Sequence, residues 1–478
     1  MGVAVSGWRL ARAVAETGQL GVVSGTALDV VHARILNDGD PGGHLRRAYG
    51  AFPHPEVADR VLRRWYVPGG RDPASPYRKV PMFSPRPARS LVELAVVATF
   101  AEVWLAREGH DGPVGINLLQ KVEIPTIFGL FGAMVAGVEV VIMGAGIPAA
   151  IPGLLDALAT GRRCTHRIDV EGGGDSFEVE LDPLNWWDWQ PQLTRPRFLA
   201  VVSSHTLATY LARDATTRPD GFVVEGPTAG GHNAPPRGRP GLDERGQPVY
   251  GPRDVPDLGR IAELGLPFWL AGGHGRVGGL AAARRLGAEG IQVGTAFALC
   301  EESGITEDLR QEVIARARRD ALVVRTDPVA SPSGYPFKVA VLDGTVASPE
   351  VYDARRRVCD LGYLRTPFRR VDGTIGLRCP SEPVDAYARK GGSVDDTVGR
   401  ACLCNGLMAT VGLGQRRPDG AEPPVVTMGD DVNAAVHALA PHAGDWSASA
   451  VVRLLLDGEP EGARGERAVD PGSCRPSR

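Results

Sequence analysis

The chain has 478 residues, of which 43% are hydrophobic and 23% charged, a composition typical of a globular protein with a sizeable core. Four lysines and 49 arginines face 56 acidic residues, and the formal net charge of −3 gives no basic excess that would favour nucleic acid as a partner. Seven cysteines are too few for a disulfide scaffold. The sequence shows no signal peptide and no apolar span of about 20 residues. We therefore expect a cytoplasmic protein without a membrane partner.

Short apolar stretches alternate with helical patterns through about the first 300 residues. The predicted strands are Gly2–Ser6, Leu20–Ser24, Val114–Leu118, Val138–Met143, Phe198–Ser203, Gly221–Glu225, Pro267–Ala271 and Gly290–Val293. The predicted helices are Trp8–Glu16, Leu91–Arg107, Thr126–Ala136, Ala149–Ala159, Thr206–Arg213, Val255–Leu264 and Val277–Leu286. Eight strands with intervening helices predict an α/β fold, a (β/α)8 TIM barrel, with an open doubly wound sheet as the alternative.

Several segments interrupt this alternation and predict the domain organisation. We expect a barrel over residues 1–320, with long insertions at about 37–90 and 166–195, the second of them a β-hairpin excursion. A Gly- and Pro-rich loop, 226–253, is too long for a plain connector and is expected to be functional. A C-terminal region containing cysteines follows over residues 321–456, and residues 457–478 have the composition of a disordered tail.

Two glycine-containing turns follow consecutive predicted strands late in the barrel. They are Gly272-Gly273 and Gly294-Thr295. In barrels the loops after the last two strands commonly bind a phosphate through backbone N–H groups, and Thr295 adds a hydroxyl. The same stretch contains a G-x-G-x-x-G pattern, but a dinucleotide fold would need an acidic residue at the end of the next strand, and none is present. A phosphate site is favoured over the dinucleotide fold and over glycines that serve turns alone.

Two polar side chains are candidates for the chemistry of this end of the barrel. His232 follows the turn Gly230-Gly231 shortly after a strand, and histidine is the side chain whose ordinary pKa of about 6.5 suits proton transfer near neutrality. Asn117, near the end of another strand, is placed to bond the edge of a heteroaromatic ring. A purely structural role remains the alternative for each residue.

Four of the cysteines lie within 46 residues of one another in the C-terminal region. They are Cys359, Cys379, Cys402 and Cys404. Four thiolates suit a tetrahedral zinc ion or an iron–sulfur cluster, although the spacing is not the usual pair of C-x2-C motifs. The sequence leaves a metal site and free structural thiols both open.

Taken in order, five motifs resemble those of the nitronate monooxygenase (2-nitropropane dioxygenase-like) family of FMN-dependent (β/α)8 enzymes. They cover about the first 320 residues and read Gly-Ile-Asn117-Leu, Val-Ile-Met-Gly-Ala-Gly-Ile-Pro148, Glu-Gly-Pro-Thr-Ala-Gly-Gly-His232, Ala-Gly-Gly273 and Gly-Ala-Glu-Gly-Ile-Gln292-Val-Gly-Thr295. The resemblance implies a flavoprotein oxidoreductase, a monooxygenase that oxidises a nitronate or nitroalkane-like metabolite with oxygen. It also implies that His232 is catalytic and handles the α-proton of the substrate. The cofactor-binding residues that it implies for FMN are Asn117, Glu225, Gly230, Gly231, Gly272, Gly273, Gln292, Val293, Gly294 and Thr295.

One departure from that family points to a second activity. Glu225 stands where nitronate monooxygenases usually have glutamine. Together with the motifs Val-Pro-Gly-Gly70 and Glu-Ser-Gly-Ile305, it makes the chain similar to the related FMN-dependent enoyl reductase subunits of polyunsaturated fatty acid and trans-acyltransferase polyketide synthases. That alternative implies reduced nicotinamide in place of oxygen as co-substrate, and an enoyl thioester that can be linked to a carrier protein. A flavin-binding scaffold subunit without turnover is the non-enzymatic alternative.

Overall fold

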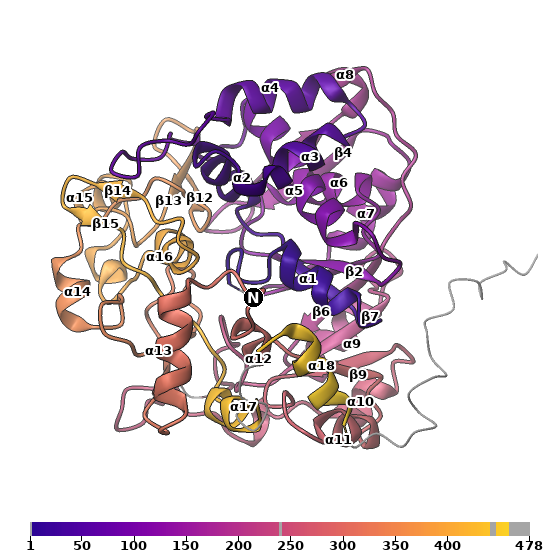
Figure 1. Ribbon diagram of the computed structural model, residues 1–478, viewed down its shortest axis with the longest axis vertical. Helices are drawn as coiled ribbons and strands as arrows, with labels where there is room; N and C mark the ends of the chain where they lie inside the picture. The colour runs from indigo at the N-terminus through magenta and orange to yellow at the C-terminus, as the bar shows by residue number, and fades with distance from the viewer. Residues whose placement is uncertain (1, 239–240, 440–445, 458–478) are drawn as a thin grey trace, which may run out of the picture.

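The computed structural model describes residues 2–238, 241–439 and 446–457. Helices of the N-terminal half occupy the upper part of Figure 1, in indigo and purple, and elements of the C-terminal region lie to the left and below, in orange and yellow. The predicted tail, residues 457–478, lies outside the described residues except for Asp457.

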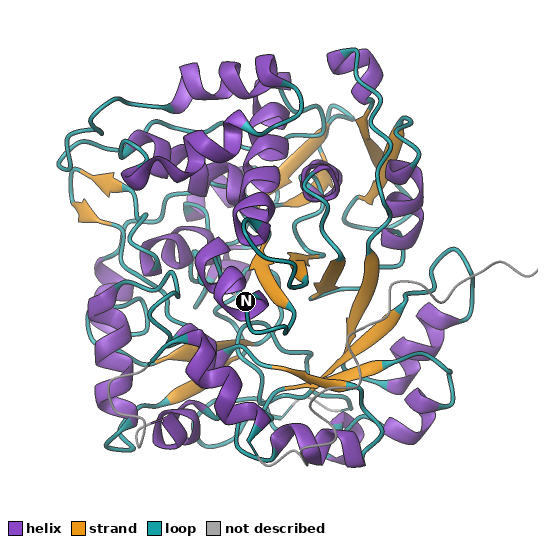
Figure 2. Cartoon of the chain, turned by 45° about the vertical axis from the view of Figure 1, so that its right-hand side comes forward, coloured by secondary structure: helices purple, strands orange, loops and turns teal. Residues whose placement is uncertain are grey.

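Seven parallel strands form the central sheet, and their order in space is their order along the chain, as in a barrel. They are β1 (Gly21–Ser24), β2 (Val114–Leu119), β3 (Val140–Gly144), β6 (Arg197–Val202), β7 (Gly221–Glu225), β8 (Phe268–Ala271) and β9 (Gly290–Gln292). Figure 2 shows the strands in orange curving through the molecule with helices outside them. This curled, consecutive parallel sheet confirms the predicted α/β class and its barrel-type strand order.

The predicted first strand, Gly2–Ser6, is wrong, because these residues form turns. Ala4 has a left-handed φ of 52°, which an extended strand does not allow. Ser6 still accepts a hydrogen bond from Ser24 N at 2.8 Å, and Val5 accepts one from Gly304 N at 2.9 Å. The N-terminal segment therefore lies between β1 and the chain that follows β9, without adding an eighth strand.

Side chains alternate between the two faces of the sheet, as parallel strands require. On one face Ile142, Leu199, Val223 and Ala271 pack together in a small apolar cluster inside the curl. On the other face the strands pack against helices in the main core, among them the 19-residue helix α5 (Arg89–Arg107), most of whose side chains are buried. A sheet covered on both faces explains why the strands are apolar almost throughout.

The remaining helices of the first 320 residues surround this sheet. They are α1 (Trp8–Ala15), α2 (Leu28–Asn37), α3 (His44–Gly50), α4 (Pro55–Trp65), α6 (Thr126–Val135), α7 (Ile151–Ala159), α8 (Pro183–Trp187), α9 (His205–Ala212), α10 (Leu258–Ala262), α11 (Gly279–Arg285), α12 (Thr295–Ala298) and α13 (Glu307–Ala317). The helices predicted from the sequence are present with boundaries shifted by a few residues, and α3 and α4 lie within the insertion at 37–90.

The second insertion contains the expected hairpin, formed by the antiparallel strands β4 (Cys164–Asp169) and β5 (Ser176–Leu181). Aromatic side chains after it attach the insertion to the barrel. Trp187 stacks on Phe131 with ring centroids 6.0 Å apart, and Trp186 stacks on Phe128 at 6.4 Å. Both phenylalanines belong to α6, so the insertion is packed on the barrel helices.

The C-terminal region consists of short hairpins and helices. Its strands are β10 (Val324–Asp327), β11 (Phe337–Ala340), β12 (Thr366–Arg369), β13 (Ile375–Arg378), β14 (Arg416–Arg417) and β15 (Gly420–Ala421), and its helices are α14 (Pro349–Ala354), α15 (Val384–Arg389), α16 (Leu403–Thr410), α17 (Val432–Leu439) and α18 (Ala448–Leu456). Phe337, Leu361 and Leu403 of this region share one apolar core with the strands of the barrel. The division at residues 320 and 321 remains a prediction. Within the described ranges, no helix combines the length and apolar character needed to cross a bilayer.

Candidate functional site

Three polar side chains face the inside of the curl near the carboxyl ends of their strands. Asn117 of β2 is paired with Ile142, and Glu225 of β7 and Gln292 of β9 are paired with Ala271, so each shares the face of the inner apolar cluster. None of the three side chains makes a hydrogen bond with another described residue. Polar groups that face inward without protein partners are suited to bind a ligand.

Glu225 is the ionisable member of this group. Burial raises the pKa of its carboxyl group to about 7. A carboxyl group with this pKa is present in both protonation states at neutral pH, so it can donate a hydrogen bond or a proton to a bound molecule.

The two glycine turns lie at the carboxyl ends of β8 and β9, as predicted. Gly272 and Gly273 have left-handed φ values of 85° and 74°, and a side chain at Gly272 would meet Thr228 Oγ1 at 2.9 Å. At Gly294, by contrast, a Cβ atom would meet nothing within 4 Å. Among the described residues, the N–H groups of Gly273 and Gly294 have no hydrogen-bond acceptor. Free N–H groups beside an open space are what an anion requires.

The other glycines of the predicted cofactor set contact the C-terminal region. A Cβ at Gly230 would meet the backbone of Met428 at 2.9 Å, and Gly231 N donates to Thr427 Oγ1 at 2.9 Å. Val293 lies against Gly275, where a Cβ would come within 2.9 Å of its side chain. These three predicted positions shape the turns through backbone and apolar contacts.

Thr295 is already engaged by the same C-terminal segment. Its hydroxyl accepts a hydrogen bond from Gly429 N at 3.0 Å, and it also bonds Asp431. The neighbouring Asp430 forms an ion pair with the buried Lys338, with Nζ and carboxylate oxygen 2.8 Å apart. The predicted phosphate turn therefore borders two carboxylates, and the backbone of Gly294 is more accessible to an anion than the Thr295 hydroxyl.

His232 lies in the long loop after β7 and packs against the C-terminal region. Its Nε2 atom lies 2.7 Å from Ser331 Oγ. Burial, reinforced by the positive charge of Lys121, lowers the pKa of the imidazole to about 3. The ring is therefore neutral at physiological pH, and a negative charge beside it would be needed to raise its low affinity for a proton.

The loop after β2 contributes two ionisable residues that the sequence analysis missed. Burial lowers the pKa of Lys121 to about 8 and raises that of Glu123 to about 7. Lys121 Nζ lies 3.2 Å from the centroid of the Tyr335 ring, and it forms no salt bridge with the described residues. The sequence did offer one signal for Lys121, which is that it comes shortly after the predicted strand that contains Asn117. The site thus has a cation next to its neutral histidine.

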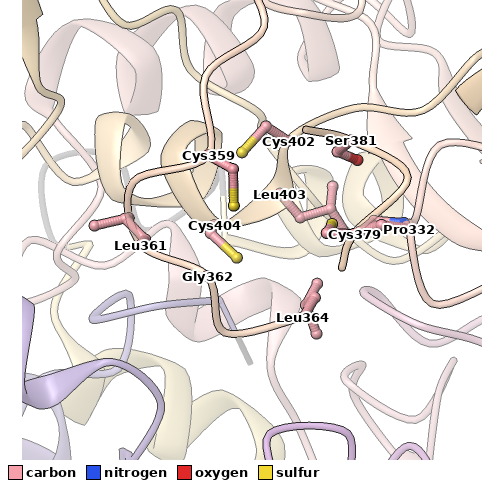
Figure 3. Close-up of a pocket in the computed structure, with 10 residues that line it drawn as sticks. All are labelled: Pro332, Cys359, Leu361, Gly362, Leu364, Cys379, Ser381, Cys402, Leu403 and Cys404. Carbon is pink, nitrogen blue, oxygen red and sulfur yellow. The ribbon is translucent and has the colours of Figure 1, made fainter. Parts of the chain in front are cut away.

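The four cysteines of the C-terminal region surround one small cavity of about 10 Å³, together with Leu361, Leu364 and Leu403 (Figure 3). The four cysteines that the sequence analysis grouped therefore do lie together in the structure. Within the part of the chain that the structure describes, however, no group of three or more His, Cys, Asp or Glu side chains is arranged to hold a metal ion.

The surroundings of these thiols raise their pKa values. Burial raises the pKa of Cys359 to about 12 and also raises those of Cys379, Cys402 and Cys404, and the proximity of the Cys402 sulfur adds to the shift of Cys359. The zinc or iron–sulfur site suggested by the sequence finds no support in this arrangement of the described residues.

Comparison with known proteins shows what this part of the chain is similar to. The model of the family described as nitronate monooxygenase matches residues 195–340, the stretch that contains Glu225, His232, both glycine turns and Ser331. A nitronate monooxygenase from Paraburkholderia phytofirmans is 37% identical over 108 residues, which cover 21% of this chain and 26% of that protein. The resemblance to the nitronate monooxygenase family is thus confirmed for this part of the chain.

Other relatives are more distant. A (3aS,4S,5R,7aS)-5-hydroxy-7a-methyl-1-oxo-octahydro-1H-indene-4-carboxyl-CoA dehydrogenase from Rhodococcus jostii is 29% identical over 127 residues, 27% of this chain and 32% of that protein. The chain thus spans at most about a third of these curated relatives. A solved nitroalkane oxidase from Streptomyces ansochromogenes is 15% identical with a TM-score of 0.46, covering 95% of this chain and 92% of the other. FabK from Thermotoga maritima is 18% identical with a TM-score of 0.39, covering 73% and 70%. Scores this low do not establish a common fold.

Proposed function

We propose that the chain is an FMN-dependent oxidoreductase of the nitronate monooxygenase type, which oxidises a nitronate or nitroalkane-like metabolite with oxygen. The observation that carries the proposal is that the neutral His232, which lies in the family-matched stretch 195–340, is close enough to the Lys121 ammonium for that charge to lower its pKa. A nitronate is an anion, and Lys121 supplies the positive charge that attracts it. His232 is assigned to accept the proton of the parent nitroalkane, and the negative charge that forms on the substrate raises the low pKa of the imidazole as it does so.

The residues present fit FMN. The phosphate is assigned to the N–H groups at Gly273 and Gly294, where the space in front of Gly294 is open. The ring edge, which has several hydrogen-bonding atoms, is assigned to the unpartnered side chains of Asn117, Glu225 and Gln292. When bound, FMN supplies the redox chemistry, and the protein supplies orientation and electrostatics. Asp431 is expected to become protonated or to turn away when a phosphate binds beside Thr295.

A second candidate is an FMN-dependent enoyl-thioester reductase. Glu225 favours it, because a carboxyl group with a pKa near 7 can protonate the carbon next to a thioester carbonyl. The similarity to a dehydrogenase whose name specifies a CoA thioester adds limited support. In this reading the co-substrate is reduced nicotinamide, and the substrate can be linked to a carrier protein.

One experiment separates these activities. The purified protein, loaded with FMN, is assayed for oxygen uptake with a series of alkyl nitronates and their parent nitroalkanes, and for NADPH oxidation with an enoyl thioester. We expect oxygen uptake with nitrite release. His232→Asn should abolish it for the nitroalkanes, whose α-proton must be removed, and not for the nitronates, which have already lost that proton. NADPH oxidation that depends on the enoyl thioester would instead establish the reductase. A flavin-loaded protein inactive in both assays would favour the scaffold alternative.

A further inference from the structure

The imidazole of His232 is held by a segment from the C-terminal region. Asn233 N donates to Pro336 O and Lys338 N donates to Gly231 O, both at 2.9 Å, so the two chains pair on either side of the histidine. The Phe337 ring meets the imidazole edge-on, with centroids 4.9 Å apart. These contacts leave the ring little freedom to move away from Ser331.

Ser331 is itself fixed by contacts that do not involve His232. It is fully buried, and its carbonyl oxygen accepts a hydrogen bond from Arg400 Nη1 at 2.6 Å. Ser333 N donates to its hydroxyl oxygen at 3.2 Å, and the two hydroxyl oxygens lie 2.7 Å apart. The Ser331 hydroxyl is therefore held in place by contacts other than the one with His232.

We infer that Ser331 is a positioning residue that holds His232 as its Nε2–H tautomer, so that Nδ1 is the atom that accepts the substrate proton. A neutral imidazole has one donor and one acceptor nitrogen, and the partner of one nitrogen sets the role of the other. In this tautomer Nε2–H donates to Ser331 Oγ and the Ser331 hydroxyl donates to Ser333 Oγ, whereas the other tautomer would leave an Nδ1–H without an acceptor among the described residues. Nδ1 makes no hydrogen bond with the described residues, so its lone pair remains for a ligand.

This inference rests on the proposed function only for the identity of the proton donor, the substrate. The tautomer itself can be measured without turnover. The chain has 10 histidines, so the protein is labelled with ¹⁵N in the imidazole rings and the signals of His232 are assigned by their loss in His232→Asn. We expect a protonated Nε2 and an unprotonated Nδ1 in the wild-type protein. A protonated Nδ1 would overturn the inference, whatever the variants at position 331 show.

Variants test whether Ser331 sets this state. Ser331→Ala should give a mixture of tautomers and lower kcat at least about tenfold, a part of the ~10²–10⁴-fold that acid–base catalysis contributes, with KM and FMN content little changed. Ser333→Ala is the matched control, since it removes a neighbouring hydroxyl and leaves Ser331 beside Nε2; we expect it to keep the tautomer. An unchanged tautomer in folded Ser331→Ala would contradict the assignment. If the wild-type protein proves inactive in both assays of the proposed function but has the Nε2–H tautomer, the function fails and the positioning stands.

Discussion

The carboxyl ends of the strands, which we call the mouth of the curled sheet, and the four-cysteine cavity both contain chemically active side chains, but the surroundings of these side chains differ. At the mouth, Asn117, Glu225 and Gln292 face inward without a hydrogen-bond partner among the described residues. In the cavity, the thiols lie among leucines, and burial holds them in the protonated state. Polar groups that face inward without a protein partner are suited to bind a ligand, whereas thiols in apolar surroundings behave as small hydrophobic side chains.

The largest expected effect is on cofactor binding. Gly294→Asp introduces a carboxylate where the phosphate is proposed to lie, and it should abolish FMN binding by charge repulsion. Gly294→Ala is the control, because a methyl group there meets nothing within 4 Å and the φ of −121° suits alanine. FMN content per chain, measured by absorbance after gel filtration, decides between them. A folded Gly294→Asp protein with full flavin content would mean that the phosphate lies elsewhere.

Next in size is the effect on proton transfer. His232→Asn keeps a polar side chain but removes the proton acceptor, so turnover of a nitroalkane should fall by about 10²–10⁴-fold. The FMN content should remain that of the wild-type protein. Steady-state kinetics test this, and activity within about twofold of wild type would exclude His232 as the proton acceptor.

The charge of Lys121 should affect substrate binding more than turnover. Lys121→Met should raise KM for a nitronate by about tenfold, which corresponds to roughly 1.4 kcal/mol. Because the pKa of Lys121 is lowered to about 8, the ammonium is charged below pH 8 and neutral above it, so the wild-type KM for an anionic substrate should rise as the pH passes 8. Lys79→Met, at an exposed lysine, is the control. A KM independent of pH between 7 and 9 would show that the ammonium does not bind the substrate.

The smallest effect is expected at the cysteine cavity. Cys379→Ser replaces a buried thiol, which has the backbone of Ser381 as a hydrogen-bond partner, by a more polar hydroxyl in apolar surroundings, and should lower the free energy of unfolding by about 1–3 kcal/mol. Because burial raises the pKa values of the four thiols, they should also react slowly with iodoacetamide at pH 8 until the protein is unfolded. Denaturant titration and alkylation followed by mass spectrometry check both. Rapid alkylation of these thiols in the folded protein would show that the cavity is open.

The comparison also shows where sequence reasoning succeeds. The apolar runs predicted the seven strands of the sheet, and the glycine turns fell at the ends of β8 and β9, because both signals are local. The resemblance to a family supplied Glu225 and Gln292, and the strand register of the structure places both on one face. The cysteines were also expected to meet, but their spacing contained no information on burial, and burial decides whether a thiol ionises.

The predictions from sequence failed where contacts between residues far apart in the chain decide the structure. Gly2–Ser6 has the composition of a strand, yet contacts with Ser24 and Gly304 accommodate it as turns. Ser331 is 99 residues from His232 in the sequence, and only the folded C-terminal region brings them together. Lys121 carried no motif, and its importance arises from burial beside Tyr335. Contacts of this kind depend on tertiary packing, which local patterns do not encode.

The central claim, that the mouth of the sheet is a flavin mononucleotide site, is tested most directly by comparing two flavins that differ only in the phosphate. Flavin-free protein is titrated with FMN and with riboflavin, and the quenching of flavin fluorescence is followed. Because the free N–H groups at Gly273 and Gly294 are assigned to the phosphate, we predict one FMN per chain and riboflavin binding weaker by at least about 100-fold, roughly 2.7 kcal/mol. Equal affinity for both flavins, or no binding of either, would contradict the account.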